Sequence, residues 1–285
     1  MGTLYVVATP IGNLEDITPR ALRTLRDVSL IAAEDTRHTG RLLAHFSIET
    51  PMVSYHTFNE RSRRQRLLDA VASADIALVT DAGTPAISDP GVELVDAVLQ
   101  AGYPVRTIPG PSSLTAAVSI SGLLSGPFTF LGFLPRKAGE RRDLLARAAA
   151  NGFGVVLYES PNRLQALLHE LLVVFEGRRF AVARELSKLH ESLERRVFVI
   201  GNDFVEFADV RGEIVLIIEP SIGDPDLSDP AETLRELISA GMRASEAART
   251  GAQLTGRPRS ELYNLAIVLE KELRETQTVK THQPD

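Results

Sequence analysis

Three loops rich in glycine and proline follow apolar runs in the chain, and they hold many of the residues suited to binding a ligand. The first spans residues 9–16, the second 81–91 and the third 109–113. Glycine lets backbone amides approach a bound molecule closely, and proline fixes the turn. Ser112 stands where it would cap a following helix, whose N-terminus favours a carboxylate or a phosphate. Each loop, taken alone, is explained equally well as an ordinary turn between a strand and a helix.

Several familiar kinds of site are excluded. The chain has no Gly-x-Gly-x-x-Gly fingerprint, no Gly-x-x-x-x-Gly-Lys-Ser/Thr loop and no Gly-x-Ser-x-Gly elbow, which argues against the usual dinucleotide, nucleoside-triphosphate and hydrolase sites. It contains no cysteine, so disulfides, thiolate metal sites and a thiol nucleophile are ruled out. The six histidines are scattered along the chain, and we therefore expect no metal site.

The charge distribution combines a net negative chain with local positive stretches. A net charge of −6 argues against a protein whose whole surface binds nucleic acid, because Lys and Arg drive phosphate binding. Arginines nevertheless gather at 61–66, 136–142, 184–196 and 243–259. Such stretches are usually solvated helix faces or salt-bridge partners. Four of them on an acidic chain also suit local phosphate contacts.

The loops require a scaffold, and the apolar pattern predicts an α/β fold. Short apolar runs at 4–8, 29–33, 76–80, 105–109 and 128–132 are predicted strands, with amphipathic stretches between them. This alternation predicts a mainly parallel, doubly wound sheet. The three loops then lie at the carboxyl ends of strands, where such sheets bind ligands.

A second α/β unit and a helical segment follow a hinge at residues 133–139. Predicted strands lie at 154–159, 179–185, 195–200 and 213–219, with a helix at 161–175. After a linker at 221–230, three short helices at 231–240, 244–254 and 260–273 have helix-turn-helix spacing. We predict α/β domains at 1–133 and 139–220, a helical appendage at 231–273 and a disordered tail at 274–285. No secretory signal or membrane span is apparent, so we expect a soluble, cytoplasmic protein.

A series of short motifs runs in order along residues 3–220. The motifs are Thr-Pro-Ile-Gly-Asn-Leu-Glu-Asp at 9–16, Ala-Glu-Asp-Thr-Arg-His-Thr at 33–39, Asp-Ala-Gly-Thr-Pro at 81–85, Pro-Gly-Pro-Ser at 109–112, Gly-Phe-Leu-Pro at 132–135, Tyr-Glu-Ser-Pro at 158–161, Arg-Glu-Leu-Ser-Lys at 184–188 and Arg-Gly-Glu at 211–213. In these motifs the chain closely resembles the ribosomal RNA small subunit methyltransferase I family, within the tetrapyrrole methylase-like (class III) superfamily. The helical appendage resembles a helix-turn-helix segment found in the same family.

The resemblance implies two α/β domains that form a cleft, S-adenosylmethionine as the cofactor, a homodimer, and 2′-O-methylation of a cytidine in the decoding centre of 16S ribosomal RNA. The tetrapyrrole enzymes carry Gly-x-Gly-Pro-Gly-Asp in the first loop, of which only Gly12 remains here, and this fits the RNA-directed branch. The implied cofactor contacts are Pro10, Ile11, Gly12, Asp81, Gly83, Thr84, Ile87, Gly110, Ser112, Ser113, Tyr158, Gly212 and Glu213.

Methylation of a hydroxyl requires an in-line approach and the loss of a proton, which a carboxylate, histidine or lysine can accept. The candidates are Glu34, Asp35, His38, His56, Glu60, Glu185 and Lys188, of which Asp35, Glu185 and Lys188 are our predicted catalytic residues. Asp35 would equally serve as a helix cap or a partner of Arg37, and Lys188 would equally be a solvent-exposed side chain.

Contacts with RNA are expected from positive side chains near the strand ends and from a polar turn beside two aromatic residues. At least one of these aromatics, Tyr55 and Phe58, is expected in the core. The predicted RNA contacts are Arg37, His38, His56, Asn59, Arg136 and Arg184.

Two other functions remain open. A small-molecule methyltransferase of the tetrapyrrole type would share the cofactor loops, and a non-catalytic RNA-binding assembly factor would use only the appendage and the basic stretches. Transfer of label to ribosomal subunits or to a porphyrinoid separates the first from RNA methylation. Binding of S-adenosylmethionine distinguishes a methyltransferase from the non-catalytic assembly factor, which would not bind it.

Overall fold

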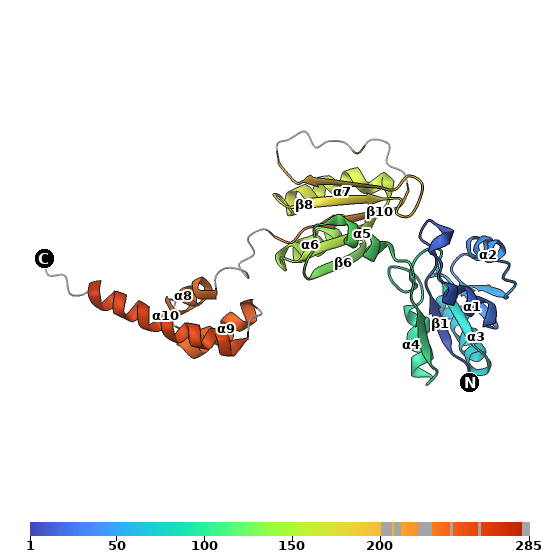
Figure 1. Cartoon of the computed structure of the whole chain (residues 1–285), viewed down its shortest axis with the longest axis horizontal. Coiled ribbons are helices and arrows are strands. Elements are labelled where there is room, and N and C mark those ends of the chain that lie inside the picture. The colour runs from blue at the N-terminus through green and yellow to red at the C-terminus, as the bar shows by residue number, and fades with distance from the viewer. Residues whose placement is uncertain (201–206, 208–211, 222–229, 240–241, 256–257, 281–285) are drawn as a thin grey trace. The chain divides into compact units, whose positions relative to one another are not determined.

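The computed structural model describes residues 1–200, 207, 212–221, 230–239, 242–255 and 258–280, with only the backbone of 253–255 and 274–280. The chain divides into two compact units, Met1–Glu219 and Pro220–Asp285. The first unit holds two five-stranded sheets with helices on their faces, and the second is helical (Figure 1).

The first sheet is entirely parallel, as the alternation of apolar runs predicts, and has the strand order β3-β2-β4-β1-β5. Its strands are β1 (Leu4–Val7), β2 (Leu30–Ala33), β3 (Met52–Ser54), β4 (Ile76–Val79) and β5 (Val105–Ile108). The sequence did not predict β3, because an edge strand of only three residues gives no recognisable apolar run. The loops after β1, β4 and β5 are the three glycine-rich loops. Since β4, β1 and β5 are neighbours, these loops emerge side by side at one edge.

Helices cover both faces of the first sheet. They are α1 (Pro19–Asp27), α2 (Thr36–His45), α3 (Glu60–Ser73) and α4 (Val92–Gln100). Successive strand residues point to opposite faces, so Ile31 packs with α1 and α2 while Ala32 packs with α3 and α4. Thr18 caps α1 through a 3.1 Å hydrogen bond from the Ala21 amide, and Pro19 occupies the first turn. The sheet is therefore buried on both sides, and its carboxyl edge is left for the loops.

The second sheet is mixed and has the order β6-β7-β10-β8-β9, in which only β6 and β7 pair in parallel. Its strands are β6 (Phe128–Phe133), β7 (Gly154–Glu159), β8 (Arg179–Arg184), β9 (Ser192–Val197) and β10 (Ile214–Ile218). The run at 128–132, expected in the first sheet, pairs instead with β7. The physical reason lies in α5 (Ser113–Ser121), which packs through Ala117 against the second sheet and delivers the chain to its edge.

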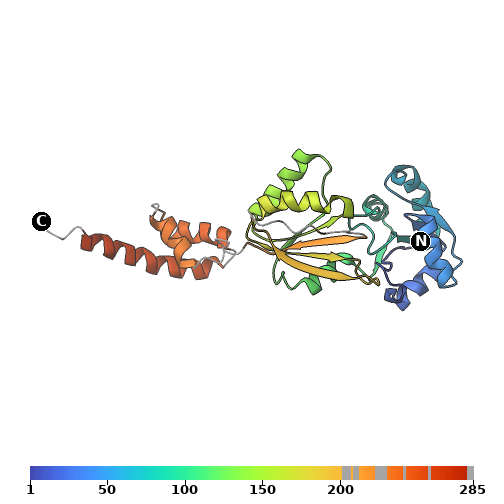
Figure 2. The ribbon, with the colours of Figure 1, turned by 90° about the horizontal axis from the view of Figure 1, so that it is seen from above.

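The helices of the second sheet lie on opposite faces. Leu145 of α6 (Ala138–Ala150) and Leu164 of α7 (Pro161–Val174) are fully buried against one face, whereas α5 covers the other (Figure 2). The leucines of α7 are spaced three or four residues apart, as an amphipathic helix requires. This arrangement leaves the β8–β9 loop directed towards the loops of the first sheet, as the contacts below establish.

The second unit contains α8 (Pro230–Ser239), α9 (Ala244–Thr255) and α10 (Arg259–Lys280). Its own small core includes Leu234, Ala247, Ala248 and Leu262, and the alanines allow the helices to approach closely. Within the tail predicted to be disordered from residue 274, α10 continues to Lys280, and residues 281–285 lie outside the described part. Among the described helices, none is both long and apolar enough to cross a membrane.

Candidate functional site

Backbone hydrogen bonds tie the three glycine-rich loops together. Thr9 and Gly83 exchange two of them, with N–O distances of 2.9 and 3.1 Å. The Thr84 hydroxyl donates to the carbonyl of Pro111 at 3.3 Å, which joins the second loop to the third. Gly83 has a φ of +80°, a conformation that side-chain-bearing residues rarely adopt. The loops therefore form one preorganised surface.

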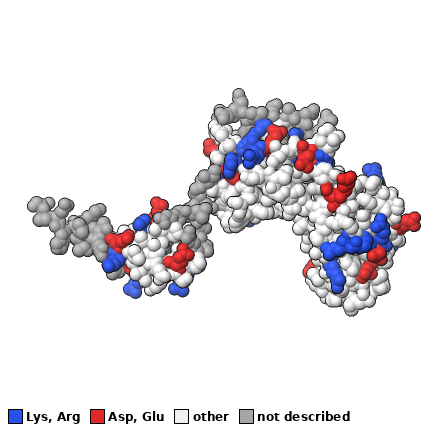
Figure 3. All heavy atoms as spheres, viewed as in Figure 1, with Lys and Arg blue, Asp and Glu red and all other residues white. Residues whose placement is uncertain are grey.

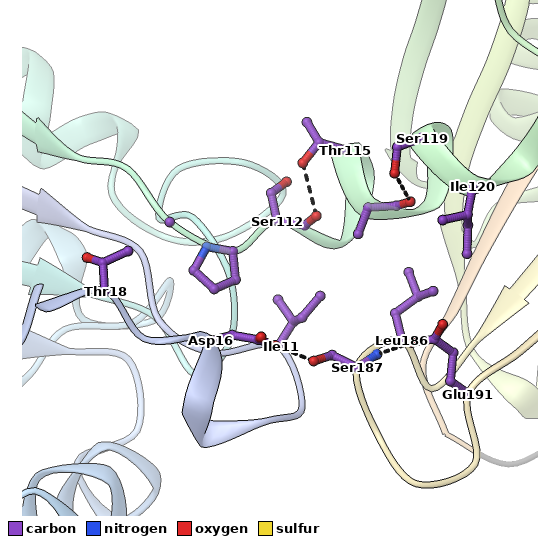
Figure 4. A pocket seen from close by; sticks show the side chains of 13 residues that line it. Ile11, Asp16, Thr18, Ser112, Thr115, Ser119, Ile120, Leu186, Ser187 and Glu191 are labelled. Carbon is purple, nitrogen blue, oxygen red and sulfur yellow. Dashed lines mark hydrogen bonds between the residues drawn. The ribbon is translucent and has the colours of Figure 1, made fainter.

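The second sheet meets this surface at two places. The Ser113 hydroxyl donates to the Tyr158 hydroxyl at 2.9 Å. In the β8–β9 loop, the Ser187 hydroxyl donates to the Asp16 carboxylate, and Figure 4 shows the two loops facing each other. At Gly12 an added Cβ would strike the Lys188 side chain and come within 2.8 Å of the Leu186 carbonyl oxygen. Glycine is thus required where these loops touch.

A cavity of about 370 Å³, here called the central cavity, lies between the loops and the second sheet. It is lined by residues of all three loops, by the end of β7 and by the start of β10. The predicted cofactor contacts that line it are Ile11, Asp81, Gly83, Thr84, Ile87, Ser112, Ser113, Tyr158, Gly212 and Glu213. Of the remaining three, Pro10 and Gly12 line an adjoining cavity, and Gly110 lines a third. Arg211, which belongs to one of the quoted motifs, lies outside the described residues.

Five acidic residues line the central cavity: Glu34, Asp81, Asp89, Glu159 and Glu213. Burial raises the pKa of Asp89 to about 7, and the charges of Glu34 and Asp81 add to the shift. Burial also raises the pKa of Glu34, whose Oε2 accepts a 3.3 Å hydrogen bond from the Asp81 amide. Sequence reasoning missed Asp89. The feature of the sequence that could have pointed to Asp89 is the Ser88-Asp89-Pro90-Gly91 end of the second loop. In the structure, Ser88 and Gly91 on either side of it have positive φ. Buried carboxyl groups with raised pKa values, such as those of Glu34 and Asp89, favour a cationic ligand.

The opposite wall is aromatic. The Tyr158 ring lies 5.0 Å from Phe130 and 5.5 Å from Phe133, both measured between centroids. Burial raises the pKa of Tyr158, so its hydroxyl stays protonated and accepts the hydrogen bond from Ser113. The next residue, Glu159, is 2% exposed, and its carboxylate accepts a 2.7 Å hydrogen bond from the Ser160 amide and lies 3.4 Å from Arg163. These contacts fix the wall on β7 and α7.

A second cavity, of about 340 Å³ and here called the side cavity, adjoins the central one. The two share Ile11, Asp81, Ala82 and Glu213 as lining residues. The rest of the side-cavity lining is Pro10, Gly12, Leu14, His38, Arg41, Leu42 and Lys188. A molecule in the side cavity would thus be adjacent to one in the central cavity, which is what a two-substrate reaction requires.

Lys188 is held between two carboxylates at the edge of the side cavity. Its Nζ lies 2.9 Å from Glu185 Oε1 and 3.5 Å from Glu213 Oε2. Burial alone would lower the pKa of Lys188, but the hydrogen bond to Glu185 and the charge of Glu213 outweigh it and raise that pKa. For Glu185, burial is likewise outweighed by hydrogen bonds from Lys188 and the Glu213 amide, which lower its pKa. Lys188 is therefore a stable ammonium group rather than a ready proton acceptor.

Asp35, the third predicted catalytic residue, caps α2. Its carboxylate accepts a 2.8 Å hydrogen bond from the Arg37 amide and forms a 2.7 Å ion pair with the Arg37 guanidinium. The hydrogen bonds from Arg37 hold the pKa of Asp35 well below its usual range. The sequence offered two alternatives to a catalytic role for Asp35, a helix cap and a partner of Arg37. The structure contains both. A carboxylate with so low a pKa is a weak base.

The predicted RNA contacts are dispersed. Only His38 lines the side cavity. The Arg37 side chain is 87% exposed on α2, and Arg184 is bound to Ser192 at 3.0 Å and lies 3.5 Å from Glu194. Arg136 is exposed near the start of α6. Figure 3 shows positive side chains in separate groups with acidic ones among them rather than in one continuous stripe.

His56 and Asn59 form a turn before α3. The Asn59 side-chain oxygen accepts from the His56 amide at 2.8 Å, and its nitrogen lies 3.2 Å from the His56 ring. Neither residue lines the cavities described above. Tyr55 is fully buried, whereas Phe58 is 98% exposed, so one of the two aromatics is in the core, as expected.

The matches to known proteins cover both units. Residues 3–198 match the family of Tetrapyrrole (Corrin/Porphyrin) Methylases, and residues 224–270 match the RsmI C-terminal HTH domain. A protein of Synechocystis sp. named ribosomal RNA small subunit methyltransferase I is 46% identical over 279 residues, covering 95% of this chain and 99% of the relative. The chain belongs to the ribosomal RNA small subunit methyltransferase I family. A family member from Xylella fastidiosa is 44% identical over 268 residues, covering 92% of this chain and 98% of its own length.

Solved structures share the fold of this family member. The methyltransferase CobJ superposes with a TM-score of 0.60 at 19% identity, over 78% of this chain and 95% of its own. A uroporphyrin-III C-methyl transferase from Thermus thermophilus, complexed with S-adenyl homocysteine, gives a TM-score of 0.54 at 22% identity, over 77% of this chain and 97% of its own. Within the described residues, no group of three or more potential ligands could hold a metal ion.

Proposed function

We propose that this chain uses S-adenosylmethionine to methylate the ribose 2′-hydroxyl of a decoding-centre cytidine in 16S ribosomal RNA, acting in the cytoplasm on the small subunit. The observation that carries the proposal is the pair of adjoining cavities, one acidic and preorganised, the other bordered by positive side chains. Full-length similarity to proteins named ribosomal RNA small subunit methyltransferase I supports the substrate class.

The central cavity fits the cofactor in charge and in shape. S-adenosylmethionine supplies a methyl group on a cationic sulfur, and transfer to a hydroxyl oxygen leaves S-adenosylhomocysteine and one proton. The carboxylates of Glu34, Asp81 and Asp89 suit its positive charges, and the left-handed turn at Gly83 exposes backbone groups. Tyr158 and Ser113 close the opposite side through their 2.9 Å hydrogen bond.

The proton released from the acceptor needs a carboxylate near both cavities. Asp81 and Glu213 line both, whereas the predicted Asp35 serves as a cap. Lys188 holds Glu213 at 3.5 Å and thereby fixes its orientation. We therefore assign proton acceptance to Asp81 or Glu213, and assign Lys188 and Glu185 to positioning.

Cofactor affinity should depend on pH through Asp89. Because the pKa of Asp89 is raised to about 7, the group is largely neutral below that pH and charged above it. A cationic ligand binds the charged form better, so affinity should rise with pH, by about tenfold between pH 6 and pH 8 if only that form binds. Calorimetric titration of S-adenosylmethionine across this range measures the effect. Asp89→Asn should abolish the dependence, while Asp96→Asn, an exposed residue of α4 that lines none of the cavities described above, should keep it.

Removal of the chain from Ala231 onward should spare cofactor binding and weaken RNA engagement. The helical unit has its own core and is a separate unit of the chain, so we expect the first unit to fold without it. It carries Arg243, Arg249 and Arg259 as exposed charges suited to phosphates. We expect at least about a tenfold higher subunit concentration for half-maximal methylation. Equal activity of the truncated and full-length chains on small subunits would contradict the assignment.

The decisive experiment offers the purified chain labelled S-adenosylmethionine and small subunits from cells that lack the gene. Label should appear in 2′-O-methylcytidine after complete nuclease digestion of the 16S RNA. Label in a porphyrinoid alone would instead favour the tetrapyrrole-type alternative, and failure to bind the cofactor would favour a non-catalytic assembly factor. The homodimer implied by the family resemblance stays a prediction, which sedimentation equilibrium tests.

A further inference from the structure

We propose that the side cavity binds the acceptor nucleotide, drawn out of its RNA strand, with its ribose towards the central cavity and its phosphates on His38 and Arg41. This inference rests on the proposed function and adds the location and orientation of the substrate. The cavity of about 340 Å³ lies in the range of small-molecule sites and suits a single nucleotide better than a duplex.

The outer wall of the side cavity offers nitrogen donors for a phosphate, and one of them, the Arg41 guanidinium, is charged. His38 and Arg41 are three residues apart on α2, so they lie on one helix face, and both are solvent exposed. Across the described residues, Arg41 makes no ion pair, unlike Arg37, which is bound to Asp35 on the same helix. A guanidinium at a cavity rim without a carboxylate partner is suited to a phosphate.

The inner wall is negative, and its charge determines the orientation of the nucleotide. Asp81 and Glu213 lie where the side cavity meets the central one. Carboxylates repel phosphate but accept hydrogen bonds from hydroxyl groups. A nucleotide in this gradient directs its ribose hydroxyls inward and its phosphates outward, towards Arg41. The acceptor atom next to the central cavity is then a ribose oxygen rather than a base nitrogen.

Apolar side chains provide a surface for the base. Leu14, in the short 3-10 helix Leu14–Asp16, is 40% exposed and lines the side cavity together with Ile11 and Leu42. An unstacked base loses its contact with neighbouring bases, and packing against apolar side chains compensates part of that loss. The side cavity therefore offers a distinct surface for each of the three parts of a nucleotide.

A third cavity, of about 680 Å³ and larger than the central and side cavities, does not suit this ligand. It lies on the other side of Ile11, between the first loop, α5 and the β8–β9 loop (Figure 4). Its charged lining residues are Asp16 and Glu191, and no Lys or Arg lines it. Phosphate would be repelled there, so volume alone does not identify the RNA site.

The test compares Arg41→Ala with Arg23→Ala, an exposed arginine of α1 that lines none of the three cavities described above. Both changes remove one positive charge. Arg41→Ala should raise the KM for small subunits about tenfold and reduce the salt slope of RNA binding by about one. S-adenosylmethionine affinity should be unchanged, and Arg23→Ala should match the wild type. A second variant, Leu14→Trp, should fill the side cavity and block methylation while the central cavity still binds cofactor.

The outcomes separate this inference from the proposed function. If the wild type methylates small subunits but Arg41→Ala behaves like Arg23→Ala and Leu14→Trp stays active, the nucleotide binds elsewhere and the inference is overturned. If the wild type binds S-adenosylmethionine but methylates no small subunits, the proposed function itself is wrong. A raised KM in Arg41→Ala and lost methylation in Leu14→Trp, each with wild-type cofactor affinity, would support both this inference and the proposed function.

Discussion

Replacing Gly83 by valine is expected to lower S-adenosylmethionine affinity by about ten- to hundredfold and to abolish methylation at ordinary cofactor concentrations. Gly83 has a φ of +80°, and a branched residue held there carries a strain of about 1–3 kcal/mol. When the unliganded loop of the variant relaxes to another backbone conformation and cofactor binding must restore the strained one, that strain corresponds to the stated loss of affinity, since each 1.4 kcal/mol is tenfold. An added Cβ would also lie 3.6 Å from Ile11, so the larger valine crowds the cavity wall.

The matched control is Gly126→Val. An added Cβ at Gly126 meets nothing within 4 Å, and its φ is not in the left-handed range. Circular dichroism should show both variants folded, and titration calorimetry should show the loss only for Gly83→Val. A folded Gly83→Val protein with wild-type affinity would mean that the second loop does not bind the cofactor.

Replacing Lys188 by alanine is expected to reduce the single-turnover rate at saturating RNA by about a hundredfold, the size of effect typical of a lost preorganised charge contact. Lys188 bridges Glu185 at 2.9 Å and Glu213 at 3.5 Å, and its raised pKa keeps it charged. Its removal frees Glu213 from its fixed orientation and leaves two carboxylates uncompensated. The KM for RNA and the salt slope should change little, because these carboxylates already neutralise the ammonium group.

Lys137→Ala is the appropriate control for Lys188→Ala. Lys137 forms the same kind of pair, with a glutamate three residues away at 2.9 Å, but it is 81% exposed and lines none of the described cavities. It should retain the wild-type rate. An effect of Lys188→Ala on KM alone would identify a phosphate contact, and wild-type rates and salt slopes would identify a solvated structural pair.

The sequence predicted the parts of the fold that local patterns determine. Parallel strands and their loops were predicted because apolar runs alternate with amphipathic segments, and because glycine and proline mark the strand ends. The strand β6 was recognised but assigned to the wrong sheet, since the choice of partner depends on how α5 packs, through Ala117, against β10 and β8. No local pattern in residues 128–133 contains that information.

The sequence predicted which residues line the site better than it predicted their ionisation states and roles. The resemblance identified most of the central cavity, but the state of its ionisable groups depends on burial. Asp89 looks like any turn aspartate in sequence, and only the surrounding carboxylates and desolvation raise its pKa. Arg41 likewise resembles every other helix arginine, because its role depends on which way α2 faces. A catalytic role for Asp35 stays a prediction, and the structure contains both alternatives that the sequence offered, the cap of α2 and the ion pair with Arg37.

The position of β10 in the second sheet bears on how the chain is made. β10 is the last strand in sequence, yet it lies between β7 and β8, bonded to both. While synthesis proceeds, the first sheet can assemble from contiguous residues, but β7 and β8 wait with open edges until Ile218 has left the ribosome. Gly212, which lines the central cavity, and Glu213, which lines both cavities, emerge just before β10. A nascent chain therefore cannot hold cofactor until its α/β unit is essentially finished. A stalled fragment ending before β10 has one open edge on β7 and one on β8, and these edges are exposed to aggregation or proteolysis.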